Sequence, residues 1–204
     1  MQRLDIRSIV TFKYQQNSGK LPENKENLLN RDFKASNIFQ KLVTDITFIH
    51  VKPVGWTYLA SIMDLYSRKI LGYSYGQKID AELATNAVKN ACLNIKNTDG
   101  MLLHSDLGSQ YTSDIFENYL SSKGIKHSFS RNGNPYDNAC IESFHSLLKK
   151  EMIYCKEYHF FEEAQSDIFE YIESWYNRKR RHAFLNYKTP QEVEDYALNL
   201  WNLI

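Results

Sequence analysis

The sequence has little cysteine and no long apolar run. Its three cysteines, Cys92, Cys140 and Cys155, are widely spaced and odd in number, which excludes a disulfide framework and a CxxC zinc site. No apolar stretch approaches the ~20 residues of a membrane-spanning helix, and no charged-then-apolar signal segment opens the chain. We therefore expect a cytoplasmic protein with reduced cysteines and no membrane partner.

The sequence also lacks a strong charge of either sign. Its 25 basic residues nearly balance its 24 acidic ones, so the net charge gives no indication of a nucleic-acid partner. Any contact with DNA must depend on local basic clusters or on bound metal. With 43% hydrophobic and 24% charged residues, the 204-residue chain has the composition of one compact globular domain with an appendage.

The apolar pattern divides the chain into an arm and a core. Residues 1–36 mix charged residues, Asn and Gln with few periodic apolar positions, and predict a connecting arm. The core, residues 37–204, opens with "LVTDITFIHV", "GWTYLASIMDLYS" and "KILGYSY", which predict three antiparallel strands, the first two joined by a hairpin at "KPVG". Helices are then predicted at 80–96, at 113–122 and after residue 135, alternating with strands at 101–105 and 125–130. This order predicts an α/β fold with a mixed five-stranded sheet flanked by helices.

Two aspartates stand at unusual places in the predicted strands. Asp106 follows the buried run "MLLHS". There it would either cap the next loop, with Gly108 supplying the turn conformation, or belong to a catalytic site. Asp45 lies within "LVTDITFIH" on the same side as Val43 and Ile49, where an unpartnered charge is costly. An edge strand with a solvated Asp45 is the alternative.

A strong helix-start signal lies in "RNGNPYDNACIESFHSLLKKE". Asn134 and Pro135 predict the cap and the first position of the helix. Asp137 would bring negative charge to the positive end of that helix.

Glu142 lies on this predicted helix in a polar stripe that it shares with His145 and Lys149, beside the apolar face. It would be either an ordinary surface glutamate, paired with His145, or part of a site. The spacing favours a site, because 35 residues separate Asp106 from Glu142.

Taken in order, these residues resemble the orfB-type transposases of bacterial insertion sequences. The matching motifs are "TDIT", "SRKILGYS", "HSDLGSQYTS", "GIKHSFSRNGNPYDNACIESFHSLLKKE", "YIESWYNRKRRH" and "TP", within about residues 24–195. The resemblance implies a DDE catalytic core similar to retroviral integrase, with the ribonuclease H-like fold. By position, it implies that Asp45, Asp106 and Glu142 form the catalytic triad, accompanied by Lys149.

The sequence departs from this family's pattern at two positions. Leu42 stands where a tryptophan is common, and Leu107 stands where arginine or glutamine is frequent. Neither position is a ligand, so the implied triad is unaffected. The resemblance also suggests that Met1 begins near the end of an upstream helix-turn-helix region, so an upstream-frame product would normally supply recognition of the element's ends.

The implied chemistry depends on metal. Three neighbouring carboxylates repel one another unless divalent cations compensate their charge. The resemblance implies two Mg²⁺ or Mn²⁺ ions, held by Asp45, Asp106 and Glu142. Such a pair activates the attacking oxygen of a phosphodiester displacement and stabilises the leaving oxygen. We therefore expect a DNA transposase core that cleaves and transfers DNA strands during transposition, a process of DNA integration and recombination.

Two groups of residues are candidates for DNA contact. Arg131 and Asn132 precede the predicted catalytic helix, and Lys149 and Lys150 lie on it. The densest basic cluster of the chain adds Arg178, Arg180 and Arg181. A structural role is the alternative for this cluster, because cations at a helix C-terminus interact favourably with the helix dipole.

Histidine gives no metal-binding signature of its own. No histidine pair has zincin spacing, and the HHCC arrangement of integrase zinc domains is absent. His104, two residues before Asp106, would be either a packed strand histidine or a neighbour of the metal ligands.

Two other functions remain as alternatives. A truncated, non-transposing product could bind DNA or transposase and act as an inhibitor. A ribonuclease H-like nuclease of another purpose is disfavoured by the transposase-like stretch "YNRKRRH". Because transposition holds two DNA ends together, we also expect self-association on DNA.

Overall fold

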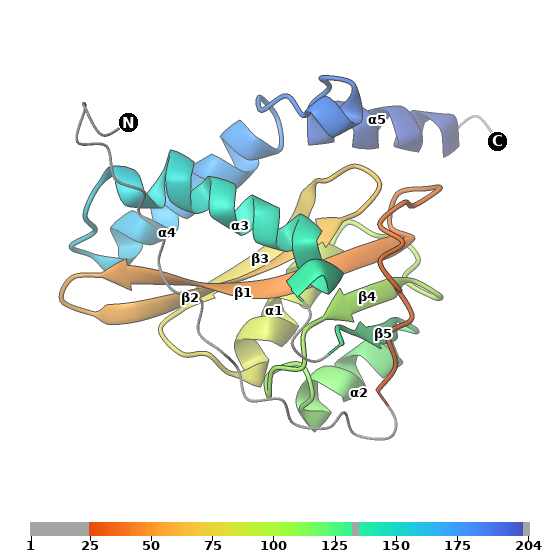
Figure 1. The fold of residues 1–204 in the computed structure, drawn as a ribbon, viewed down its shortest axis with the longest axis horizontal. Helices are drawn as coiled ribbons and strands as arrows, with labels where there is room; N and C mark the ends of the chain where they lie inside the picture. The colour runs from red at the N-terminus through yellow and green to blue at the C-terminus, as the bar shows by residue number, and fades with distance from the viewer. Residues whose placement is uncertain (1–24, 132–134, 202–204) are drawn as a thin grey trace, which may run out of the picture.

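A computed structural model describes residues 25–131 and 135–201 of the chain, so the predicted roles of Asn132 and Asn134 lie outside the described residues. In those ranges the strands form one sheet of order β3-β2-β1-β4-β5 (Figure 1). Antiparallel pairing joins β1 to β2 and β2 to β3, and parallel pairing joins β4 to β1 and β5. The predicted mixed five-stranded sheet is confirmed: β1 (Lys41–Val51), β2 (Gly55–Asp64), β3 (Ile70–Gly76), β4 (Leu102–Ser105) and β5 (Lys126–Phe129).

Helices cover both faces of this sheet. Figure 1 shows α3 and α4 across one face, with α1 and α2 against the other. None of the helices in the described ranges is long and apolar enough to cross a membrane. The helices are α1 (Ala81–Cys92), α2 (Asp114–Ser122), α3 (Ala139–Glu151), α4 (Phe161–Phe169) and α5 (Pro190–Trp201). Three short 3₁₀ turns, η2 (Pro135–Asn138), η3 (Ile153–Cys155) and η5 (Ala183–Leu185), and one π-helical segment, η4 (Glu170–Tyr176), complete the helical elements of the described residues.

The alternation of β1 explains the two layers. Val43 and Ile49 are fully buried on the face covered by α3 and α4, whereas Leu42 and Ile46 are buried on the face covered by α1 and α2. Successive side chains of a strand point to opposite faces, so one strand serves both hydrophobic cores. Asp45 belongs to the α3 face, as its sequence position predicted.

Local signals set the positions of α1 and α2. Oδ1 of Asp80 accepts the N–H of Leu83 (2.8 Å), and Oγ of Ser113 accepts the N–H of Phe116 (3.3 Å). Both are N-cap interactions that satisfy otherwise unpaired helix donors. The predicted helices at 80–96 and 113–122 are therefore confirmed, and α1 ends four residues earlier than predicted, at Cys92.

The predicted helix after residue 135 begins differently from the prediction. The chain first makes the 3₁₀ turn η2, and α3 starts only at Ala139, four residues after Pro135. Asp137 is fully buried in this turn, where it pairs with Arg31 and Arg131. Its charge is therefore used for long-range ion pairing, which the periodicity of the helix did not indicate.

The C-terminal region is also more varied than one long helix. After Phe169, α4 continues as the π-helical segment η4, whose wider turns are rare and often occur at functional sites. The segment ends beside β3, where Oδ1 of Asn177 accepts the N–H of Ile70 (3.0 Å) and Nδ2 donates to its carbonyl oxygen (3.0 Å). These two hydrogen bonds of a buried side chain hold the end of η4 against β3, the edge strand of the sheet.

The described part of the predicted arm lies on the core. Leu29 is 1% exposed and belongs to the hydrophobic cluster on the α3 face, and Phe33 packs against the same cluster. The N–H of Phe129 at the end of β5 donates to the carbonyl oxygen of Glu26 (2.9 Å). Residues 25–36 are therefore packed against the sheet, while residues 1–24 lie outside the described part of the chain.

Candidate active site

The parallel pairing of β1 and β4 brings two of the predicted site residues together. Val43 on β1 is the register partner of His104 on β4. Asp45 lies two residues further along β1, and Asp106 lies two residues after His104, directly beyond the end of β4, so the two residues follow neighbouring parallel strands on the same side of the sheet. Asp45 is in the central strand of the sheet, which excludes the edge-strand alternative.

The two carboxylates influence each other. Burial, followed by the negative charge of Asp45, raises the pKa of Asp106 to about 6. The fully buried Tyr111, whose hydroxyl lies 3.2 Å from Oγ1 of Thr44, has its pKa raised by burial and then by both aspartates. The site thus concentrates negative charge at a place with limited access to water.

The loop after Asp106 follows the predicted capping pattern with one difference. The N–H of Gly108 donates to Oδ1 of Asp106 (2.9 Å), which fixes the carboxylate at the end of β4. However, Gly108 is not among the residues with positive φ, so the expectation that it supplies a conformation other residues resist is wrong. A side chain at this position would instead displace the side chain of Gln110, which lies directly over Gly108.

The third predicted residue comes from α3. Glu142 is exposed in the first turn of this helix, three residues before His145. His145 is buried against the sheet, with Nδ1 3.4 Å from Oδ2 of Asp45 and Nε2 3.3 Å from Oγ of Ser61. His145, one of the residues of the polar stripe that carries Glu142, therefore lies beside Asp45.

Lys149 is the next residue of the same stripe. Burial lowers the pKa of its ammonium group, and the negative charge of Asp45 partly opposes that change. The charge of Lys149 is therefore directed toward the carboxylates, whereas Lys150 is exposed.

The remaining basic candidates are mostly held by other protein groups. Arg131 forms a two-bond pair with Asp137, with Nε and Nη2 both 2.9 Å from its oxygens. Arg181 donates to the carbonyl oxygen of Tyr187 (3.0 Å), and Arg178 is exposed. These contacts support the structural alternative for part of the basic cluster.

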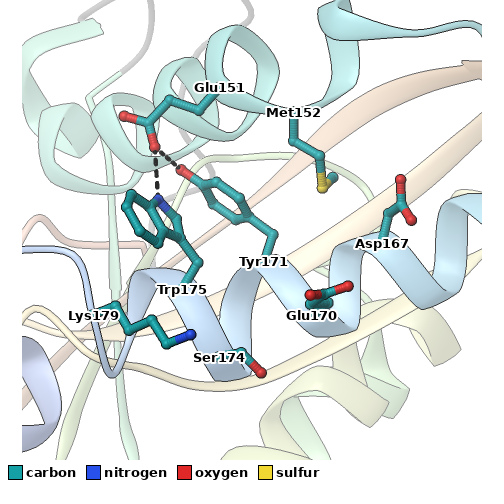
Figure 2. Close-up of a pocket in the computed structure, with 8 residues that line it drawn as sticks. All are labelled: Glu151, Met152, Asp167, Glu170, Tyr171, Ser174, Trp175 and Lys179. Carbon is teal, nitrogen blue, oxygen red and sulfur yellow. Dashed lines mark hydrogen bonds between the residues drawn. The ribbon is translucent and has the colours of Figure 1, made fainter.

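Glu151, the last residue of α3, forms hydrogen bonds with Arg180 and with two aromatic side chains near it. Its carboxylate accepts hydrogen bonds from Tyr171 Oη (2.7 Å), Trp175 Nε1 (3.3 Å) and Arg180 Nη2 (3.1 Å). Figure 2 shows the carboxylate between the two aromatic side chains. Arg180 thus joins α3 to the segment that follows η4.

His104 is a packed strand histidine, as one of its two interpretations predicted. It is fully buried, and its ring nitrogens lie 2.8 Å from Oγ of Ser128 and 3.0 Å from Oγ of Ser130. Burial lowers its pKa to about 4, so the ring is neutral near pH 7.

Comparison with known proteins identifies the family. The chain matches the profile described as "Integrase core domain" over residues 36–135, and a second profile of that description over residues 123–190. It is 41% identical over 170 residues to the transposase for insertion sequence element IS904 of Lactococcus lactis, covering 83% of this chain and 67% of that protein. The chain belongs to the insertion-sequence transposases.

Other transposases of this family give a similar match. Transposase InsF for insertion sequence IS3A of Escherichia coli K12 is 38% identical over 173 residues, covering 85% of this chain and 60% of that protein. The chain thus spans about 60–67% of the length of these relatives.

Solved structures place this transposase chain in the ribonuclease H-like fold. The HTLV-2 integrase catalytic core domain in complex with magnesium superposes with a TM-score of 0.58 at 17% identity, covering 79% of this chain and 99% of that one. An intasome chain of simian T-cell lymphotropic virus gives a TM-score of 0.63 at 16% identity, covering 89% of this chain and 59% of that one. The predicted fold class is confirmed.

The donor set of the transposase site fits a hard divalent cation in part. A carboxylate whose pKa is raised by burial and by a neighbouring carboxylate, as for Asp106 beside Asp45, is stabilised by such a cation, and carboxylate oxygens are its preferred ligands. Oδ1 of Asn138 is buried without a hydrogen-bond partner, while Nδ2 donates to the carbonyl oxygen of Thr44 (2.9 Å). Within residues 25–131 and 135–201, however, no three acidic, histidine or cysteine side chains lie close enough together to hold a metal ion.

Sequence reasoning missed Asp137 and Asn138 as neighbours of this site. Both lie in η2, and both side chains are at least nine-tenths buried. The sequence contained part of the signal for these two residues, since the polar residues of "NPYDNA" directly precede the helix that carries Glu142. Their partners come from distant segments of the chain, which local patterns do not specify.

Proposed function

We propose that this chain is the catalytic core of a DNA transposase and carries out metal-dependent strand cleavage and strand transfer. The proposed catalytic residues are Asp45, Asp106 and Glu142. The observation that carries the proposal is that the parallel strands β1 and β4 lead to Asp45 and Asp106, where burial and then the charge of Asp45 raise the pKa of Asp106. Family membership supplies the reaction class.

The three carboxylates have distinct proposed roles. Asp45, in the central strand, would be the ligand shared by two Mg²⁺ or Mn²⁺ ions, with Asp106 and Glu142 each completing one ion. When bound, such ions activate the attacking oxygen and stabilise the leaving oxygen of a phosphodiester displacement. The first nucleophile would be water, and the second would be the 3′-hydroxyl that the first cleavage exposes.

Neighbouring side chains prepare this arrangement. Nδ1 of His145 lies 3.4 Å from Oδ2 of Asp45 across the sheet–helix interface, where the imidazole limits the rotation of the carboxylate. The N–H of Gly108 holds Asp106 in place. Lys149 contributes positive charge beside Asp45, where a phosphate of the DNA would lie.

The proposed partners follow from this reaction. The substrates are the ends of an insertion sequence and a target DNA, and two ends held together require self-association on DNA. We also propose that an upstream-frame product supplies recognition of the element's ends.

The proposal is tested with a branched DNA oligonucleotide that does not require end recognition. Wild-type protein, Asp106→Ala and Glu142→Ala are compared for Mn²⁺-dependent nicking and strand joining, with Asp114→Ala, an exposed aspartate of α2, as the matched control. We expect activity in the wild type and the control only. Metal-independent activity, or substantial cleavage by either triad variant, would contradict the assignment, and a folded, inactive wild type that binds DNA or full-length transposase would favour the inhibitor function.

A further inference from the structure

Asp137 is a fully buried carboxylate that joins three segments of the chain. It accepts hydrogen bonds from Arg31 Nε (2.7 Å) and Asn27 Nδ2 (2.9 Å) in the arm, and from Arg131 after β5. The side chain of Arg131 donates twice, and its backbone N–H donates as well (3.0 Å). Hydrogen bonds from these arginines hold the pKa of Asp137 far below its ordinary value, so it is charged at all ordinary pH values.

The neighbouring residue ties the same turn to the catalytic strand. Asn138 is 6% exposed, and its Nδ2 donates to the carbonyl oxygen of Thr44 (2.9 Å), the residue before Asp45. The turn η2 is therefore held by the arm through Asp137 and by β1 through Asn138. Since α3 begins directly after Asn138, these two side chains determine where its first turn, with Glu142, lies relative to Asp45.

The arm is firmly placed where it reaches Asp137. Asn30 and Arg31 both adopt positive φ values (44° and 59°), a conformation that residues other than glycine rarely take. The N–H of Asn30 donates to Oδ1 of Asn27 (2.7 Å), and the N–H of Leu29 donates to Oγ of the buried Ser128 (3.0 Å). Such strain persists only where surrounding contacts determine the conformation.

A buried ion pair is a weak means of stabilising a fold, because desolvation offsets its attraction, but it can specify one geometry. We propose that Arg31 and Asp137 form a clamp through which the arm, residues 25–36, positions the catalytic helix, and that Asp137 is a positioning residue for Glu142. This inference rests on the proposed function of Glu142. The placement of that carboxylate then depends on a segment that lies far from it in the sequence.

The variant Arg31→Gln tests the clamp while leaving the pair of Asp137 with Arg131 intact. The Arg31 side chain is 43% exposed, so the variant is expected to fold. We expect kcat for Mn²⁺-dependent strand joining to fall by about ten- to a hundredfold with KM for DNA unchanged, as misplacement of a catalytic group predicts. Arg31→Lys should recover part of the loss, and Lys34→Gln, which removes one positive charge from an exposed position of the same arm, should match the wild type.

A second measurement does not depend on activity. Hydrogen exchange of the backbone amides at residues 139–145 should become faster in Arg31→Gln and stay unchanged in Lys34→Gln, because only the first variant releases α3 from the arm. The clamp would be overturned if amide exchange at residues 139–145 were equally fast in Arg31→Gln and Lys34→Gln. It would also be overturned if the wild type were active and Arg31→Gln had the same kcat. By contrast, failure of the proposed function would appear as wild-type protein without Mn²⁺-dependent activity, or as activity that does not require Asp106.

Discussion

Asp45 on β1 and His145 on α3 face each other, with 3.4 Å between Oδ2 of the carboxylate and Nδ1 of the imidazole. The other ring nitrogen of His145 lies 3.3 Å from Oγ of Ser61, and Ser61 is the register partner of Asp45 on β2. The imidazole therefore bridges two neighbouring strands on the face that carries the proposed metal ligands. Groups that orient a ligating carboxylate in this way tune the affinity of a metal site.

His145→Phe should weaken the response to metal more than it weakens the fold. Phenylalanine fills a similar volume but offers Asp45 no hydrogen-bonding nitrogen. We expect the Mn²⁺ concentration for half-maximal strand joining to rise by about tenfold. A Mn²⁺ titration measures this, with His159→Phe at an exposed position as the control. An unchanged midpoint would show that His145 has no part in orienting Asp45.

Asp106→Asn should stabilise the metal-free protein at neutral pH. The pKa of Asp106 is raised from 3.8 to about 6 on folding, so its stabilising contribution is complete below about 4 and is lost as the pH rises through 6. Above pH 6 we expect the variant to exceed the wild type by about 1–3 kcal/mol in the free energy of unfolding, since one pKa unit corresponds to about 1.4 kcal/mol.

Urea denaturation with a chelator at pH 4 and pH 7.5 measures this difference. The two proteins should be equally stable at the lower pH, and Asp114→Asn should match the wild type at both. A stability difference that is the same at the two pH values would be inconsistent with a raised pKa at Asp106.

Arg178 and Arg180 should differ in their effects on DNA binding. Arg178 is exposed, so Arg178→Ala should reduce the slope of log K against log salt concentration by about 1 if it contacts a phosphate. Arg180 is bound to Glu151, and Arg180→Ala should leave this slope unchanged while lowering the melting temperature. Fluorescence anisotropy at several salt concentrations measures both slopes. An equal reduction in the two variants would mean that Arg180 leaves Glu151 to bind DNA.

Asn177→Ala should destabilise the fold strongly, because the substitution removes a buried side-chain amide. The side chain is 1% exposed and pairs with both the N–H and the carbonyl oxygen of Ile70. Losing partners for two buried backbone groups costs about 2–4 kcal/mol. Urea denaturation measures the loss, with Asn94→Ala at an exposed position as the comparison. A change below about 0.5 kcal/mol would show that water replaces the amide at the edge of β3.

The sequence predicted the elements whose signals are local. Alternation identified β1 and the face of Asp45, and cap residues such as Asp80 located helix starts, because these patterns depend on neighbours within a few residues. The spacing of Asp106 and Glu142 and the ordered motifs predicted the family. The parallel pairing that places Asp45 beside Asp106 was implied only by resemblance to a known fold.

The features that were missed depend on contacts between distant segments. Arg31 and Asp137 are 106 positions apart, and nothing in either local sequence identifies the other as its partner. The π-helical segment η4 depends on tertiary anchors such as Asn177, and its composition is that of an ordinary helix. The contact of His145 with Asp45 likewise joins a helix to a distant strand, and the helical pattern around His145 did not indicate it.

The burial of Leu29 limits how far the protein can be shortened from its N-terminal side. The match to the family profile begins at residue 36, but the side chain of Leu29 is already 1% exposed within the hydrophobic cluster beneath α3. A fragment trimmed to the profile boundary would leave a leucine-sized hole and an unpaired β5 edge at Phe129. The folding unit therefore includes residues 25–36, and a protease that cuts between residues 25 and 36 should inactivate the core without touching a proposed catalytic residue.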